Sequence, residues 1–172
     1  MCELSALVSD PRSAVQPVHH DTTFDGSNPR LSLLVALQDV TCDMGPTCLF
    51  PGTNVPEWHL HLAERGEEFE ALLETTPHVL GLLTAGDAIL YDSRLLHFGG
   101  ANASHSSAAA GEGGLSSDRS SEGGTRRTML ALSVQEETGK TRVGHTNIRP
   151  GYRGRYRIDG HRQWTADVGS NP

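Results

Sequence analysis

The chain has 172 residues, of which 36% are hydrophobic, and its formal net charge is -7. This length predicts a single domain over residues 1–172 with a modest core, because the apolar fraction is below the usual range for globular domains. The absence of a basic block argues against a nucleic-acid partner, and the absence of a run of about 18 apolar residues argues against a membrane span.

Short β-rich apolar stretches separated by turn residues predict a mainly β protein. In chain order, the predicted strands cover residues 4–8, 14–19, 31–40, 47–50, 79–84, 88–91 and 128–134. Pro17 indicates an edge or a bulge in the second of them. Ala85-Gly86-Asp87 is typical of a hairpin turn between the strands on either side of it.

Three further segments differ from this pattern. Residues 58–74 mix large apolar residues with many glutamates after Pro56, which predicts one amphipathic helical insertion lying on the sheet. Residues 101–124 are dense in Ser, Gly and Ala, a composition typical of a flexible loop insertion. From residue 144 onward the tail is polar and Arg-rich, and we expect it to wrap the surface. The whole arrangement favours an all-β barrel or sandwich.

The first residues of the chain and its three cysteines are the features that predict a cellular compartment. The first residues lack the basic and long apolar stretches of a signal peptide, which predicts an intracellular, cytoplasmic location. Cys2, Cys42 and Cys48 are an odd count without metal-binding spacing. Free thiols are the favoured interpretation, and a disulfide between the second and third cysteines is the alternative.

Three side chains form a candidate metal and catalytic site. His19 and Asp21 are two positions apart, so on a strand they would face the same side and could converge on one ion. His97 follows an apolar strand and a turn far downstream. Two histidines and one carboxylate are the set that holds non-haem iron(II) and leaves three positions open. A keto acid can take two of them and dioxygen the third. The neighbouring His20 would point to the opposite face.

Several separated segments carry a resemblance to a known family. They are Gln16-Pro17-Val18-His19-His20-Asp21-Thr22, Ala36-Leu37-Gln38-Asp39-Val40, Met44-Gly45-Pro46-Thr47, Phe50-Pro51-Gly52-Thr53-Asn54 and residues 86–104. In order and spacing they resemble the phytanoyl-CoA dioxygenase family, over residues 13–104 and again over 126–135. The resemblance implies a double-stranded β-helix (jelly-roll, cupin-like) fold, with iron held by His19, Asp21 and His97 at the mouth of the barrel.

The resemblance also implies an activity. Members are Fe(II)- and 2-oxoglutarate-dependent dioxygenases that use O2 to hydroxylate a small organic substrate, with release of succinate and CO2 and in some cases with ascorbate as support. Asp21 disfavours a halogenase, which needs that position vacant for chloride. Asn102 and Ser104 match polar positions of the family, and we expect them to fix a turn. The helical N-terminal region usual in the family is missing before His19, which indicates a minimal or truncated form.

The 2-oxoglutarate anchor is the remaining element of this site. The far carboxylate of the cosubstrate needs a fixed cation, and the fork of an arginine suits it. Arg127, at the opening of the last predicted strand, fits the family spacing best, and Arg126 is the alternative. The segment between His97 and these arginines is longer than is usual in the family, and the Ser/Gly-rich loop accounts for the excess at small entropic cost.

Two other interpretations remain. The chain could be a truncated, catalytically inactive homologue that keeps the fold. It could also be a cupin-type metal-binding protein using His59, His61 and Glu64 together with His97. On a helix, however, residues two apart diverge, so the cupin interpretation requires a strand around His59.

Overall fold

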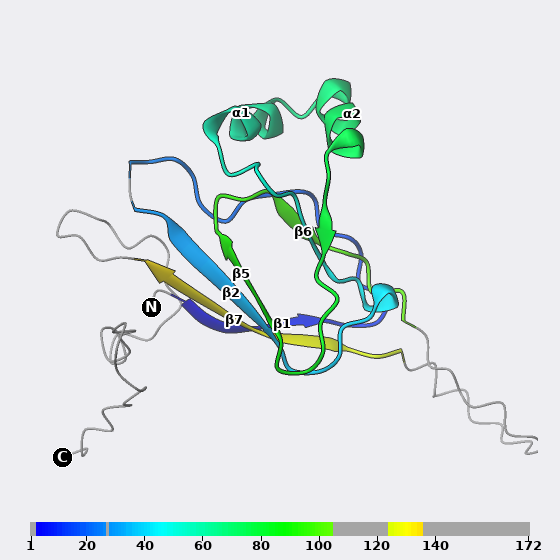
Figure 1. Cartoon of the computed structure of the whole chain (residues 1–172). Coiled ribbons are helices and arrows are strands. Elements are labelled where there is room, and N and C mark those ends of the chain that lie inside the picture. Colours follow the sequence, from blue (N-terminus) through cyan, green and yellow to red (C-terminus); the bar gives the residue numbers. More distant parts are fainter. Residues whose placement is uncertain (1–2, 27, 105–123, 136–172) are drawn as a thin grey trace, which may run out of the picture.

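The computed structural model describes residues 3–26, 28–104 and 124–135, which form two antiparallel sheets and two α-helices (Figure 1). One sheet has four strands in the order β1 (Glu3–Ser9), β7 (Arg127–Gln135), β2 (Arg30–Ala36) and β5 (Ala88–Asp92). The other has three strands in the order β4 (Val79–Leu80), β3 (Thr47–Leu49) and β6 (His97–Gly99). The architecture is the predicted mainly β, cupin-like jelly roll. Most of the predicted loop 101–124 and the tail from residue 144 lie outside the described residues.

The helical insertion is confirmed, and it consists of two helices, α1 (Pro56–Glu64) and α2 (Glu67–Thr75). Pro56 starts α1 because a proline suits the first helical position, where its missing N–H is not needed. Arg65 then adopts a left-handed conformation at φ 35° and ends the helix, so that α2 begins after Gly66. Both helices lie on one side of the molecule, away from β1 and β7 (Figure 1).

Two apolar clusters hold the layers together. The first joins the helices to the smaller sheet and contains Cys48, Phe50, Leu62, Phe69, Leu73 and Leu96. The second lies between the sheets and contains Leu34, Leu49, Tyr91, Met129 and Ala131. The second cluster therefore fixes the inner face of the larger sheet against β3, whose Leu49 pairs with His97 of β6.

The larger sheet has an inner face of alternating burial. On β2, Arg30, Ser32, Leu34 and Ala36 are buried, and on β7 every second residue from Arg127 to Ser133 is buried. This is the period of two that places successive side chains on opposite faces of a sheet. The outer face in contrast leaves apolar side chains such as Leu4, Val8 and Leu90 exposed.

Two predicted elements were wrong. Residues 14–19 form no strand and contribute a single bridge, between His19 and His97, because Pro17 has no N–H to donate to a ladder. The hairpin predicted around residues 85–87 is also absent: β4 pairs with β3, whereas β5 pairs with β2 in the other sheet. The turn residues are there, but they pass the chain from one sheet to the other.

Gly45 explains the tight contact between two of the family-like motifs. Its φ is +68°, and a Cβ atom there would lie 2.3 Å from the carbonyl oxygen of Gly100. Only a residue without a side chain allows this approach at a positive φ. The contact brings the segment after His97 against the 3-10 turn Cys42–Met44.

The side-chain amide of Asn102 links the end of β1 to Thr125, which lies just before β7. Its Nδ2 donates to the carbonyl oxygens of Ser9 (2.9 Å) and Thr125 (3.0 Å), and its Oδ1 accepts from the hydroxyl of Ser104 at 2.7 Å. The Ser104 hydroxyl also contacts the Thr125 carbonyl oxygen. As expected from the sequence, Asn102 and Ser104 fix a turn, and they bring Thr125 to a defined place whatever the length of the intervening segment.

We therefore predict that Asn102→Ala lowers the free energy of unfolding by about 2–4 kcal/mol, because it leaves several buried polar groups without partners. Asn54→Ala is the matched control, since Asn54 makes one long contact to Asp92 (3.4 Å), and we expect it to cost under about 1 kcal/mol. Urea denaturation of the two variants measures the difference. Equal losses would contradict the role given to Asn102.

Cys42 and Cys48 are free thiols, as the sequence favoured, while Cys2 lies outside the described residues. Burial raises the pKa of the Cys48 thiol. No helix in the described part of the chain has the length and apolar character needed to cross a membrane.

Candidate metal centre

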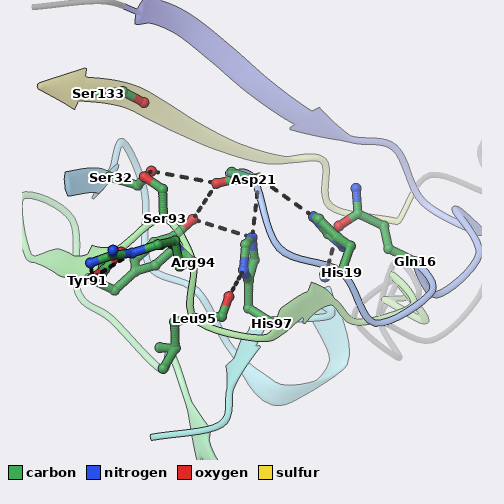
Figure 2. Close-up of polar contacts among 12 residues, drawn as sticks. Gln16, His19, Asp21, Ser32, Tyr91, Ser93, Arg94, Leu95, His97 and Ser133 are labelled. Carbon is green, nitrogen blue, oxygen red and sulfur yellow. Dashed lines mark hydrogen bonds and ion pairs between the residues drawn. The ribbon is translucent and has the colours of Figure 1, made fainter. Parts of the chain in front are cut away.

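His19, Asp21 and His97 lie together, and their side chains point toward one another (Figure 2). The Nε2 atom of His19 is 3.8 Å from Asp21 Oδ1, and that of His97 is 3.6 Å from the same oxygen. Within the described ranges they are the one group of His, Cys, Asp or Glu side chains with at least three ligand atoms inside 4.8 Å of one another. The candidate triad of the sequence is thus brought together.

Backbone contacts from Ser93 position Asp21. The amides of Asp21 and Thr22 both donate to the Ser93 carbonyl oxygen, at 2.8 and 3.1 Å. Ser93 is itself fixed, since its amide donates to Arg30 O (2.8 Å) and its hydroxyl lies 2.7 Å from that of Ser32. The two ligands His19 and Asp21 therefore converge through a loop tied to another strand, and not through the strand periodicity that the sequence suggested.

The ring orientation of both histidines leaves one nitrogen of each available. The Nδ1 atoms of His19 and His97 lie 2.9 Å from the carbonyl oxygens of Pro17 and Leu95. A carbonyl oxygen only accepts, so each Nδ1 must carry the proton and donate it. In the neutral tautomer this leaves the lone pair on each Nε2, which faces Asp21, and second-shell carbonyls impose this arrangement on metal-binding histidines.

The protonation state of His97 suits a ligand as well. Its burial lowers the pKa of the imidazole, and the nearby charge of Asp21 opposes this effect in part. Two imidazole nitrogens and one carboxylate oxygen on one face match non-haem iron(II) with open positions. The residues present therefore fit the metal that the sequence implied.

Tyr91 and Ser32 complete the polar surroundings of Asp21. The Tyr91 hydroxyl lies 3.5 Å from Asp21 Oδ2 and 3.4 Å from His97 Nε2, and the Ser32 hydroxyl lies 3.5 Å from the same carboxylate oxygen. Burial, and then the charge of Asp21, raise the pKa of the Tyr91 phenol, so it stays a neutral donor. Figure 2 shows these side chains on the side of Asp21 opposite His19.

The triad borders a cavity of about 580 Å³ whose walls come from β1, β2, β7 and β6. Arg127 lines this cavity, is 9% exposed, and its Nη1 is buried with no hydrogen-bond partner among the described residues. Burial lowers the pKa of its guanidinium. Arg126 has its side chain 64% exposed and pairs with Asp10 on the surface. Of the two candidate anchors, Arg127 is the one that faces the cavity.

Gly99 leaves the space that the Arg127 side chain occupies. A Cβ atom at Gly99 would lie 3.3 Å from Arg127 Nη2 and 2.9 Å from Gln16 Oε1. Gly99 is two residues beyond His97 on β6, so the guanidinium approaches the triad from that strand's side.

The cupin-type set is not assembled. His59, His61 and Glu64 are all on α1. The ring of His59 stacks on that of His20 at a centroid distance of 3.8 Å, and its Nε2 donates to Arg94 O at 2.8 Å. His20, as expected, takes no part in the triad.

We predict that His59→Ala and His61→Ala keep the full iron content of the protein, because neither side chain approaches the triad. Iron bound per chain after anaerobic reconstitution with Fe(II) measures this. Loss of metal in the His61→Ala variant would favour the cupin interpretation.

Sequence reasoning missed several residues that line the cavity or contact Asp21. Tyr91, Ser32 and Ser93 surround Asp21, while Glu3 and Arg30 line the far end. The alternating pattern of residues 30–36 was the available signal, but it did not show which side would face a metal.

Comparisons with known proteins give one consistent result. The family model described as phytanoyl-CoA dioxygenase (PhyH) matches residues 3–110, well over half of the chain. A comparison with curated proteins gives no significant match.

Solved structures with the same fold include the following three proteins. AviO1 from Streptomyces viridochromogenes Tue57 is 21% identical with a TM-score of 0.53, over 77% of this chain and 49% of that one. SnoK, a non-heme alpha ketoglutarate dependent carbocyclase from nogalamycin biosynthesis, is 22% identical with a TM-score of 0.52, over 76% and 47%. EctD from S. alaskensis is 17% identical with a TM-score of 0.51, over 76% and 42%. The chain thus spans about half the length of these proteins.

Proposed function

This chain belongs to the phytanoyl-CoA dioxygenase family, and we propose that it is an Fe(II)- and 2-oxoglutarate-dependent dioxygenase. It would hydroxylate a small organic substrate with O2 and release succinate and CO2, with ascorbate as a supporting reductant. The observation that carries the proposal is the triad of His19, Asp21 and His97, with both Nε2 lone pairs turned toward the carboxylate.

In this proposal the triad holds the iron. When bound, iron(II) supplies the activation of dioxygen that couples decarboxylation of the keto acid to substrate oxidation. The protein contributes the positions of the ligands: Pro17 O and Leu95 O orient the two imidazoles, and Ser93 O holds Asp21. Tyr91 and Ser32 offer hydroxyl donors to the second carboxylate oxygen of Asp21, which leaves Oδ1 directed to the histidines.

Arg127 is the proposed anchor for 2-oxoglutarate. A buried guanidinium without a partner among the described residues is costly unless an anion joins it. The 5-carboxylate of the cosubstrate supplies such an anion in a fork-to-fork geometry. Arg127 lies close to Gly99, two residues beyond His97, which supports a cosubstrate carboxylate bound on that side of the triad.

An anaerobic titration tests the proposal. Purified apo-protein receives Fe(II) and then 2-oxoglutarate, and a weak visible charge-transfer band should appear only when both are present. Succinate formation after admission of air, with and without candidate substrates, then separates an enzyme from a catalytically inactive homologue that keeps the fold. A protein that binds neither iron nor 2-oxoglutarate would refute the proposal.

A further inference from the structure

A second arginine lines the cavity. Arg30, the first residue of β2, is 9% exposed, and its Nε is buried without a hydrogen-bond partner among the residues that the structure describes. Within the described ranges no acidic side chain forms an ion pair with it. A guanidinium is never neutralised by loss of its proton in a protein, so burial of this charge is unfavourable unless an anion reaches it.

Arg30 and Arg127 lie at different ends of the cavity. In the sheet Arg30 pairs with Gln135, the last residue of β7, whereas Arg127 is the first residue of the same nine-residue strand. Eight steps along a strand span roughly 26 Å. Each side chain is shorter than half that span. The two guanidinium groups therefore cannot both contact one five-carbon dicarboxylate. If Arg127 holds 2-oxoglutarate, Arg30 is free for another ligand.

The metal centre lies between the two arginines. Asp21 contacts Ser32, which is two residues from Arg30 on the same face of β2. Arg127 reaches Gly99, two residues beyond His97. A molecule held by Arg30 would therefore extend toward the triad from the side opposite the proposed cosubstrate site.

We propose that the primary substrate is a small organic acid whose carboxylate is bound by Arg30. This inference rests on the proposed function, and it names the substrate class of the same site. The rest of the substrate would lie along Ser32 toward the metal, so the carbon that is oxidised is separated from the carboxylate by a few bonds.

Glu3 restricts the charge of that anion. Its carboxylate lines the same end of the cavity and accepts hydrogen bonds from Ser133 (3.2 Å) and Ser5 (3.3 Å). A phosphate dianion there would be repelled by a like charge in a partly dry site, and a singly charged carboxylate less so. Glu3 can also accept a proton donor of the substrate, such as a hydroxyl or an ammonium group.

The test uses matched pairs of C4–C8 monocarboxylic acids and their primary amides as probes. Affinities are measured by ligand-observed NMR in an Arg127→Gln background, so that Arg30 is the one guanidinium among the described cavity residues. We expect the acids to bind at least about tenfold more tightly than the amides. An additional Arg30→Gln substitution should bring the ratio close to one, and Arg30→Lys should restore part of it. Arg126→Gln, a change at the surface, should leave the ratio unchanged.

The two ways of failing are distinguishable. An acid preference that persists in Arg30→Gln, or no preference at all when the protein with Arg127 intact binds Fe(II) and 2-oxoglutarate, overturns the Arg30 inference alone. Absence of iron and 2-oxoglutarate binding overturns the proposed function, and this is measured without the probe acids. Thermal unfolding of the Gln and Lys variants shows that each is folded.

Discussion

Asp21→Ala is expected to weaken Fe(II) binding by at least about 100-fold and to abolish succinate formation. Removal of a second-shell partner alone costs about 10–100-fold in metal affinity, and Asp21 supplies the one anionic ligand of the triad. His97→Ala should have the same effect. An anaerobic Fe(II) titration followed by a succinate assay measures both quantities.

Two comparisons make this prediction specific. His97 is buried, so its removal also leaves a cavity that can reduce stability. His19 is half-exposed, and His19→Ala should therefore lose the metal while the thermal unfolding midpoint changes little. His20→Ala is the matched control, because that ring stacks on His59 and should keep the iron. Full iron binding in Asp21→Ala, with native unfolding, would contradict the assignment.

Arg127→Gln is expected to raise the 2-oxoglutarate concentration needed for half-saturation on the order of 100-fold. Loss of one partner of a buried, hydrogen-bonded charge pair costs about 2–5 kcal/mol, and each 1.4 kcal/mol is about tenfold in affinity. Arg127→Lys should recover only part of the loss, because lysine keeps the charge but not the fork. The dependence of the charge-transfer band on 2-oxoglutarate concentration measures the affinity directly.

The neighbouring arginine provides the control for this experiment. Arg126 carries the same charge one residue earlier, but its side chain is exposed and pairs with Asp10. Arg126→Gln should leave the 2-oxoglutarate affinity within about twofold of the unaltered protein, since an exposed pair contributes little. The reverse outcome, with a large effect at Arg126 and none at Arg127, would move the anchor to the surface arginine.

The outer face of the larger sheet exposes large apolar side chains. Leu4, Val8 and Leu90 are 44%, 53% and 62% exposed there. Contiguous exposed apolar surface promotes association in solution. The experiments above are therefore best done with the oligomeric state monitored alongside.

The fold class and the candidate ligands follow from patterns in the amino-acid sequence. Strands such as residues 30–36 and 127–135 have an alternating pattern that depends only on neighbours in the chain, so their existence could be predicted. The ordered motifs around His19 and His97 indicated the family, which the family model confirms. The helical insertion was also found, although the left-handed Arg65 that divides it gave no clear signal.

How these elements meet depends on contacts between residues that are distant in the chain. Asp21 reaches the histidines because Ser93, far along the chain, holds its backbone, and no local period encodes that contact. In the same way, β5 pairs with β2 and not with β4, because pairing depends on which long-range partner buries each strand. The inward positions of Arg30 and Arg127 at opposite ends of one cavity follow from this register. Strand periodicity depends on residues that are neighbours in the chain, whereas the candidate metal centre is formed by residues that are far apart in it.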